Sequence, residues 1–405
     1  MELRRASDDA AGTGAPTAYL LGFVLIGLGF GLGGPALSHL RDRAGVDDGA
    51  IAIVFATQSI GYILGSLVAG RGLDAGHGHR RLSLALVATT GAVALIGMAD
   101  ALAVMAGGFA LLGLAGGVCD VSGNTLVVWS RPGRAARLLN ALHLCFAVGA
   151  MLAPVVVNRS IALFRSVGGV ALPMAAVTAV ALISLHGVAT PVRVGGGAAA
   201  ESAGRVSRGR AVPVALVAGF FFVYVALEAG FAGWIHSYVE QIGYGGAGTA
   251  TGVTTAFGIG FALGRVMSVA VAERVRPGRI VAVSVVAALV VAVVFVLRPG
   301  AGVGLWVVAF ALALAVAPQY ASMLAFAETR LGLSGAETAA MVAASGLGAL
   351  LVPWAIGQGF DRLGASSFPA MIATLAALAL LVAAAAGSAV SRRPSPVRTA
   401  VECSP

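Results

Sequence analysis

The stretch GYILG at residues 61–65 recurs farther along the chain as GFALG at residues 260–264. In the same way, GAMLAP at residues 149–154 recurs as GALLVP at residues 348–353. Both recurrences have one offset, because 260 − 61 and 348 − 149 each give 199 residues. A constant offset means that no net insertion separates the repeated stretches. The sequence therefore predicts two homologous halves in parallel repeat, which is typical of transporters built by duplication with a site between the halves.

The composition is that of a membrane protein. Hydrophobic residues make up 59% of the 405 residues and charged residues only 11%, against roughly 25% charged in a soluble domain. The apolar runs at residues 17–38, 212–227 and 367–390 approach or exceed the ~20 residues that cross a bilayer as a helix. The sequence therefore predicts an all-α, multi-pass protein in a lipid bilayer.

Twelve apolar segments are candidate spans, six in each half. A Gly-, Ala- and Arg-rich segment without apolar periodicity separates spans six and seven, and it is predicted to be a cytoplasmic linker. The predicted organisation is a six-helix half at 1–190, the linker at 191–210, a second half at 211–390 and a cytoplasmic tail at 391–405. The predicted spans are 17–39, 51–70, 82–99, 101–129, 136–158, 168–189, 212–239, 248–271, 280–297, 302–327, 335–357 and 367–389.

The net charge of +9 indicates membrane orientation, and we exclude nucleic-acid binding. The arginines lie in short loops between apolar runs, as the positive-inside rule describes, and form no groove for phosphates. We therefore expect both termini in the cytoplasm and the protein in the plasma (inner) membrane. The arginines on the predicted inner side are Arg4, Arg5, Arg71, Arg80, Arg81, Arg131, Arg134, Arg137, Arg193, Arg205, Arg208, Arg210, Arg274, Arg276, Arg279, Arg392, Arg393 and Arg398.

The loop between spans two and three carries a family resemblance. The segment GSLVAGRGLD at residues 65–74, followed by Arg80 and Arg81, resembles the signature loop of the major facilitator superfamily, which has a glycine, an acidic residue and a basic pair. Twelve spans, two parallel halves and a basic central linker resemble the same superfamily. The resemblance implies its fold of two six-helix halves and transport by alternating access.

Two further stretches resemble the fucose–proton symporter and sodium–glucose transporter-like group of that superfamily. The first is GGVCDVSGN at residues 116–124, continuing to Trp129 and followed by NALH at 140–143. The second is YVALE at 224–228, continuing to GWIHSY at 233–238. In this group an acidic residue in helix four is implicated in coupling, which implies that role for Asp120. The group's proton-coupled members also have an acid in helix one, and the first span here has none.

Asp120 is the leading coupling candidate from its position as well. It lies well inside a span, where a carboxylate is costly unless it is paired, hydrated or protonated. Asn124 is four residues on and shares its helix face. We predict a proton- or sodium-linked carboxylate, with Asn124 contacting solute hydroxyls or a cation. A structural carboxylate bonded to a neighbouring helix, to Asn140 or His143, is the alternative.

Glu228 lies near the middle of span seven, with Tyr224 and Phe231 on the same face. A carboxylate beside aromatic rings often holds a sugar, because the acid accepts hydroxyl hydrogen bonds and a ring packs on the apolar sugar face. We predict coupling for Glu228 and solute binding for Tyr224, Trp234 and Tyr238. An interfacial aromatic belt is the alternative for Trp234 and Tyr238.

Other polar residues within the spans are weaker candidates. Asn140 and His143 share a face in span five, where His143 is predicted to relay a proton or orient Asp120. Gln58 and Gln319 are mid-span amides that could bind a polar solute, and Gln319 is the repeat partner of Asp120 (319 − 120 = 199). Packing and structural hydrogen bonding are the alternatives for these residues.

Gating candidates occur at matched positions of the two halves. Pro154 and Pro353 are predicted to break helices five and eleven and to allow bending. Asp74 and Glu273, beside arginines of the inner loops, are predicted to form conformation-dependent ion pairs. Their partners in the gating set are Arg80 and Arg279.

The sequence as a whole predicts a monomeric secondary active transporter that moves a small polar solute, with a sugar favoured by the resemblance. It would use no cofactor beyond a coupling proton or sodium ion, and no ATP, because the chain has no phosphate-binding loop. The three cysteines have neither metal nor disulfide spacing. A proton-coupled exporter of drugs or secondary metabolites is the first alternative. A membrane enzyme using Asp120 and His143, or a transport-inactive receptor, are more distant ones.

Overall fold

The structure of the protein is a computed structural model. It describes residues 14–46, 48–51, 53–131, 134–192, 208–245, 247–299 and 302–391. Most of the predicted linker and nearly all of the predicted tail lie outside these residues, so the predicted boundaries of both remain predictions.

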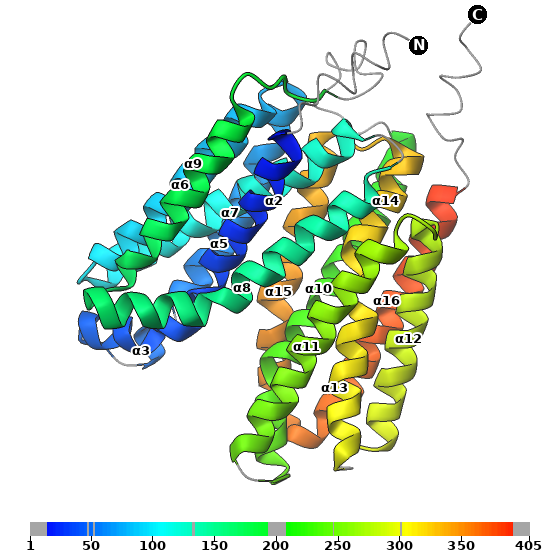
Figure 1. The fold of residues 1–405 in the computed structure, drawn as a ribbon. Coiled ribbons are helices and arrows are strands. Elements are labelled where there is room, and N and C mark those ends of the chain that lie inside the picture. The colour runs from blue at the N-terminus through cyan, green and yellow to red at the C-terminus, as the bar shows by residue number, and fades with distance from the viewer. Residues whose placement is uncertain are drawn as a thin grey trace, which may run out of the picture. The chain divides into compact units, whose positions relative to one another are not determined.

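Every regular element in the described residues is a helix (Figure 1), and twelve segments are long and apolar enough to cross a membrane. The prediction of an all-α chain with twelve spans is confirmed. The elements are α2 Gly14–Gly31, α3 Gly33–Ala44, α4 Asp48–Ile51, α5 Ile53–Asp74, α6 Gly78–Met98, α7 Leu102–Ser130, α8 Ala136–Phe164, η1 Val167–Val170, α9 Ala171–Leu185, α10 Arg208–Gln241, α11 Ala247–Val271, α12 Pro277–Leu297, α13 Val303–Val316, α14 Gln319–Leu331, α15 Gly335–Leu363, η3 Ala365–Ser367 and α16 Phe368–Ser391.

The chain forms two compact units. The first comprises Met1–Arg205 together with Ser334–Ala343, and the second comprises Val206–Leu333 with Ala344–Pro405. The start of α15 therefore packs with the first unit, and the rest of that helix packs with the second.

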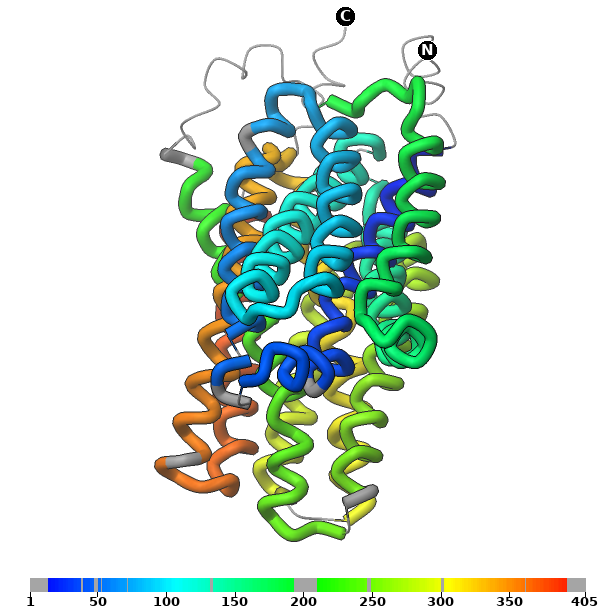
Figure 2. The backbone as a smooth tube through the Cα atoms, turned by 90° about the vertical axis from the view of Figure 1, so that its left-hand side faces the viewer, coloured from blue at the N-terminus to red at the C-terminus, as the bar shows by residue number. Residues whose placement is uncertain are grey.

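Glycines set the spacing of helices in the first unit. Gly61 and Gly65 of α5 face the α7 backbone so closely that a Cβ at either position would collide with it. Gly113 and Gly117 of α7 face α5 in the same way. Small residues allow this approach between membrane helices, and the gain is dispersion contact along the whole interface. Figure 1 shows α5 and α7 side by side, and Figure 2 shows α6 and α7, in blue and cyan, running next to each other.

The second unit repeats this contact at the positions predicted by the offset. Gly260 and Gly264 of α11 approach Phe310 and Leu314 of α13, where a Cβ would also collide. The repeated GxxxG-like stretches thus perform one packing task in each unit. The second repeated stretch behaves likewise, since Gly149 packs on α2 and its counterpart Gly348 packs on α10.

Phenylalanines of α2 fill glycine notches on α7. Phe23 lies against Gly123, and Phe30 lies against Gly116. The spacing is seven residues on both helices and runs in opposite directions, as expected for two antiparallel helices in contact over two turns. The glycines that crowd span four therefore accommodate large rings of span one.

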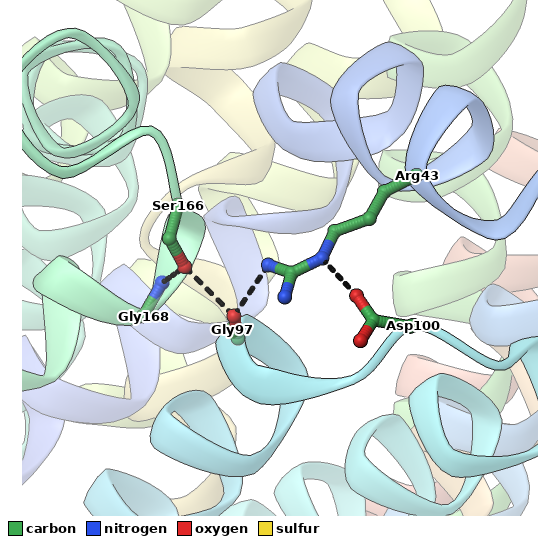
Figure 3. Close-up of polar contacts among 5 residues, drawn as sticks. All are labelled: Arg43, Gly97, Asp100, Ser166 and Gly168. Carbon is green, nitrogen blue, oxygen red and sulfur yellow. Dashed lines mark hydrogen bonds and ion pairs between the residues drawn. The ribbon is translucent and has the colours of Figure 1, made fainter.

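The first unit closes with a polar junction at one end of α3, α6 and η1. Arg43 Nε donates to Asp100 Oδ1 at 2.6 Å, and Arg43 Nη1 donates to the Gly97 carbonyl at 2.7 Å (Figure 3). Ser166 Oγ donates to the same carbonyl at 2.7 Å and accepts from Gly168 N at 3.0 Å. Because Arg43 of α3 and Ser166, the N-cap of η1, both donate to the Gly97 carbonyl of α6, the junction ties three elements to one backbone carbonyl.

Two expectations about the spans need correction. The first span ends as α2 at Gly31 rather than at 39, and α3 follows from Gly33. Span ten is interrupted, because α13 ends at Val316 and α14 begins at Gln319, on either side of Pro318. Proline removes a backbone donor and crowds the preceding turn, which explains the interruption.

The prolines that were predicted to break helices do not interrupt them. Pro154 lies inside the continuous helix α8 and Pro353 inside the continuous helix α15. Membrane helices tolerate proline because neighbouring helices satisfy the freed backbone groups. The prediction of a break is therefore wrong, and a gating role for either proline stays a prediction.

Candidate functional site

The centre of the first unit is a buried carboxylate with two hydrogen-bond donors. Asp120 of α7 is only 8% exposed. Tyr62 Oη of α5 donates to Asp120 Oδ2 at 2.5 Å, and Asn124 Nδ2, one turn along α7, donates to Oδ1 at 2.6 Å. The predicted pairing of Asp120 with Asn124 on one helix face is thus present in the structure. Both carboxylate oxygens have a donor, which stabilises a charge that apolar surroundings disfavour.

The glycine contacts of α5 and α7 place Tyr62 beside Asp120. Gly61 precedes Tyr62, and Gly117 of α7 lies directly against the Tyr62 backbone carbonyl. Because no Cβ separates the two helices there, the phenol reaches across to the carboxylate. Phe30 of α2 packs edge-to-face on the Tyr62 ring, with centroids 5.5 Å apart, and holds its orientation.

Several buried polar atoms on α5 and α7, the two helices that supply Tyr62 and Asp120, have no hydrogen-bond partner in the described residues. They are Asn124 Oδ1, Ser122 Oγ, Thr125 Oγ1 and Gln58 Nε2. Buried polar atoms in proteins are almost always paired, so orphans in apolar helices indicate that a ligand, ion or water completes the set. Gln58 is buried in α5, as the prediction of a polar ligand requires.

Asn140 and His143 of α8 are buried in the first unit, and their contacts differ from those expected. Asn140 Nδ2 donates to the Ala136 carbonyl of its own helix at 2.8 Å. The His143 ring packs edge-to-face on Phe23 at 5.6 Å. The neighbouring-helix partner of Asp120 is Tyr62 of α5, so the alternative of a structural carboxylate bonded to another helix stays open, with Tyr62 as the bonded residue. The coupling role of His143 stays a prediction.

The second unit has its own buried charged group, which includes a residue that the sequence analysis missed. Arg265 of α11 is 4% exposed. Its Nη2 donates to Tyr224 Oη of α10 at 3.3 Å, and its guanidinium carbon lies 4.8 Å from the centroid of the Phe261 ring. Electrostatic interactions join Glu228 to both Tyr224 and Arg265. Glu228 and Tyr224 of α10 are therefore neighbours, as predicted. Arg265 of α11 joins them from the next helix.

Aromatic rings surround this group. Tyr224 stacks on Phe220 with centroids 6.2 Å apart, and Tyr320 of α14 meets Phe221 edge-to-face at 4.5 Å. Gln319, directly before Tyr320, is fully buried at the start of α14. Its Nε2 donates to the Ala315 carbonyl at 3.2 Å, and its Oε1 has no partner in the described residues.

Trp234 and Tyr238 have their polar atoms occupied by backbone carbonyls. Trp234 Nε1 donates to the Pro353 carbonyl at 2.8 Å, and Tyr238 Oη donates to the Pro299 carbonyl at 2.6 Å. Tyr238 is 1% exposed, so its ring is packed inside the second unit. This geometry favours packing roles, and solute binding by either ring stays a prediction.

Asp74 contacts backbone amides, whereas the sequence analysis expected an ion pair with an arginine. Its Oδ1 accepts from Gly335 N at 2.8 Å and its Oδ2 from Ala336 N at 3.1 Å, within the first unit. These are the first free amides of α15, and a carboxylate there also meets the positive end of the helix dipole. Two successive amides can each donate to one oxygen of a carboxylate, so both oxygens of Asp74 are paired without an arginine.

The same helix start has a second cap. Ser334 Oγ accepts from Glu337 N at 3.1 Å, while Glu337 Oε2 accepts from Ser334 N at 2.9 Å. This reciprocal pair is a capping box, and its pattern of serine followed three residues later by glutamate is visible in the sequence. The other gating candidates, Arg80, Glu273 and Arg279, are exposed, and their role stays a prediction.

The fold and these buried charges define a class: a polytopic membrane carrier with titratable groups inside its spans. A family model described as "Major Facilitator Superfamily" matches residues 19–353. The chain belongs to the major facilitator superfamily, and it is an integral, multi-pass membrane protein. The resemblance stated from the signature loop and the repeat is confirmed.

Individual relatives and structures agree with this assignment. Sodium-dependent glucose transporter 1A of Mus musculus is 24% identical over 370 residues, covering 83% of this chain and 87% of the relative. The fucose:proton symporter of E. coli has a TM-score of 0.74 at 16% identity, over 91% of this chain and 98% of the other. A proton:xylose symporter has a TM-score of 0.69 at 13% identity, over 92% and 95%. The two solved structures establish the shared fold.

Two site residues were missed although the repeat contained a signal for each. Tyr62 is the second residue of the first repeated stretch, and Phe261 is its counterpart. Arg265 directly follows the second stretch, where the first half has Ser66 (265 − 66 = 199). A charged residue inside predicted span 248–271 needs a partner on the same grounds as Asp120. The matched positions 62 and 261 thus contact different charged groups. Tyr62 donates a hydrogen bond to the Asp120 carboxylate, whereas the Phe261 ring lies under the Arg265 guanidinium.

Proposed function

We propose that the protein is a secondary active transporter that moves a sugar across the membrane, coupled to protons or sodium. The observation that carries the proposal is the buried Asp120 with its donors Tyr62 and Asn124. A carboxylate kept inside a membrane span is costly and indicates a role in moving ions or protons. The names of the relatives support the sugar: one is a sodium-dependent glucose transporter and two structural neighbours are sugar symporters.

Asp120 would be the group that takes up and releases the coupling ion. The hydrogen bonds from Tyr62 and Asn124 would stabilise the ionised carboxylate before a cation binds. A proton would neutralise it directly, and sodium would be held by oxygens, of which Asn124 Oδ1 is without a partner in the described residues. Neutralisation removes the desolvation penalty of the empty site, so the loaded transporter can change conformation at lower cost.

The solute would be held by polar atoms that the spans leave without partners. Gln58 Nε2 and Asn140 Oδ1, both in the first unit, are buried and unpaired in the described residues. Gln319 Oε1 of the second unit is also buried and unpaired there, and a solute role for it stays a prediction. Sugar hydroxyls both donate and accept, so they can satisfy amide nitrogens and oxygens alike. The loss of a hydroxyl from the sugar should then weaken binding, because it leaves a buried amide without a partner.

We also propose the plasma (inner) membrane as its location, both termini in the cytoplasm and a monomer as the working unit. The distribution of arginines supports the orientation. Alternating access and gating by Asp74 belong to the same proposal. No observation favours the exporter of drugs or secondary metabolites, and the relatives named above are sugar transporters.

The test is uptake of labelled sugars into proteoliposomes under an imposed sodium gradient, an imposed pH gradient, or neither. We expect accumulation with one gradient and only equilibration without it. Asp120→Asn should abolish accumulation while exchange of internal for external sugar continues. Asp42→Asn makes the same chemical change at an exposed carboxylate paired with Arg41 and should behave as wild type. Unchanged accumulation in Asp120→Asn, or no sugar flux at all in wild type, would refute the proposal.

A further inference from the structure

Arg265 is a buried arginine that the protein does not satisfy. It is 4% exposed, and neither its Nε nor its Nη1 has a hydrogen-bond partner in the described residues. Its one hydrogen bond in the described residues, to Tyr224 Oη, is long at 3.3 Å. A guanidinium cannot lose its charge in a protein, so burial without partners costs several kcal/mol. Something outside the described chain must complete it in the functional protein.

Arg43 provides a comparison, because its Nε and Nη1 both have hydrogen-bond acceptors. Its Nε donates to the Asp100 carboxylate and its Nη1 to the Gly97 carbonyl, at 2.6 and 2.7 Å. Arg43 is partly exposed and could also use water. Arg265 is buried, yet the same two nitrogens are empty. The unused donors of Arg265 therefore lie in a buried environment, where little water competes for them. An electrostatic interaction with a ligand is stronger there than at the surface.

The internal acid does not fill these donors. Glu228 interacts electrostatically with Arg265 and shares a hydrogen bond with Tyr224, but Nε and Nη1 of Arg265 have no hydrogen-bond partner in the described residues. The guanidinium instead lies over Phe261 and touches Tyr224. This arrangement offsets the charge of the arginine but leaves two of its three nitrogens, Nε and Nη1, without an acceptor in the described residues.

We infer that Arg265 binds the carboxylate of an anionic solute, so that the transported sugar is a sugar acid. Planar guanidinium donors match a carboxylate in geometry and charge, and this pairing is among the stronger hydrogen-bond arrangements in proteins. Tyr224, which accepts from Arg265, meets Tyr320 edge-to-face with centroids 6.0 Å apart, so aromatic rings of the kind that pack on the apolar side of a sugar lie next to that charge. This inference rests on the proposed function and specifies its substrate class.

Matched pairs of sugars test the assignment in the purified full-length protein. Glucose and glucuronate differ only in the group at the sixth carbon, as do galactose and galacturonate. Thermal unfolding is measured with each sugar, because binding raises stability by mass action. We expect a uronate to bind at least tenfold more tightly than its neutral partner. Acetate controls for the carboxylate alone and should give no shift.

Two variants separate recognition from structure. Arg265→Gln should weaken uronate binding roughly 10- to 100-fold, the effect of losing a charged hydrogen-bond partner, while binding of the neutral sugar changes little. Arg265→Lys keeps the charge and should retain part of the preference. Glu228→Gln removes the competing negative charge and should tighten uronate binding. Opposite shifts from two neighbouring residues would not follow from a general loss of stability.

The outcomes distinguish this inference from the proposed function. Accumulation of neutral sugars with no preference for uronates would overturn the inference and leave sugar transport in place. A uronate preference that survives in Arg265→Gln would also overturn it, as would equal stabilisation by acetate. If no sugar of either kind is bound or transported, sugar transport itself fails and this inference fails with it. A uronate preference lost in Arg265→Gln supports both.

Discussion

The Tyr62 hydroxyl of α5 lies 2.5 Å from Asp120 Oδ2 of α7, so one hydrogen bond joins two spans at the charged centre of the first unit. The bond depends on a glycine contact, since Gly117 lets the α5 backbone approach where Tyr62 is attached. Packing and chemistry are therefore linked at this point: the residues that bring the helices together also decide which donor reaches the carboxylate.

Tyr62→Phe should alter coupling more than folding. It removes the donor and keeps the ring against Phe30, so the Asp120 carboxylate loses one of its two hydrogen bonds. We expect gradient-driven sugar accumulation to fall at least tenfold, because about 1.5–3 kcal/mol is the contribution of a hydrogen bond to a charged group. Tyr238→Phe, which loses its bond to Pro299, is the matched control and should affect thermal stability without changing the ion dependence of uptake. Equal ion dependence in Tyr62→Phe and wild type would contradict the prediction.

Gly117→Val should disrupt the contact of α5 with α7. Its side chain would collide with the Tyr62 backbone, and overpacking of this kind costs about 1–3 kcal/mol. We expect a lower midpoint of thermal unfolding and loss of accumulation together. Gly107→Val lies on the same helix, where a Cβ meets nothing within 4 Å, and should leave both unchanged. A Gly117→Val protein as stable as Gly107→Val would mean that the helices are not in close contact there.

Asp74→Ala should weaken the start of α15. The substitution removes acceptors from Gly335 N and Ala336 N and a negative charge from the helix dipole, which together contribute about 1–2 kcal/mol. Asp74→Asn should lose less, because an amide oxygen still accepts. Hydrogen exchange of the two amides is the direct measurement, with faster exchange in Asp74→Ala than in Asp74→Asn. Unchanged exchange in both variants would show that the capping box holds this helix start alone.

Trp234→Phe tests the predicted solute role of this ring. The indole N–H is occupied by the Pro353 carbonyl and the ring packs on Phe360 with centroids 4.8 Å apart. We therefore expect a stability loss of about 1 kcal/mol and an unchanged KM for sugar uptake. A KM that rises tenfold, with stability unchanged, would instead place the solute against this ring.

The candidate site could be predicted only in part from the sequence. Asp120 and Glu228 were identified because a carboxylate within an apolar span needs a reason, and Asn124 because four residues make one helical turn. The partners from other helices, Tyr62 and Arg265, were missed. Which residue of one helix faces a given residue of another depends on helix rotation and spacing, and neither quantity is local in the sequence.

The corrections have the same origin. The prolines Pro154 and Pro353 were expected to break helices, but whether a helix continues through proline depends on the neighbours that satisfy the freed groups. Asp74 was expected to pair with an arginine, and it caps a helix more than two hundred residues away in the chain (335 − 74 = 261). In both cases the sequence gives the residue type, but it does not give the residues of other helices that contact it.

The sequence by itself determined the number of spans, the duplication and the family, because hydropathy, a constant offset and a signature loop are local or periodic properties of the chain. The contacts that give the buried charges their chemistry were decided by tertiary structure alone. Glycines such as Gly117 permit a close approach without specifying the partner. The three-dimensional packing then selects a phenol as the partner of Asp120 and leaves Nε and Nη1 of Arg265 without an acceptor in the described residues.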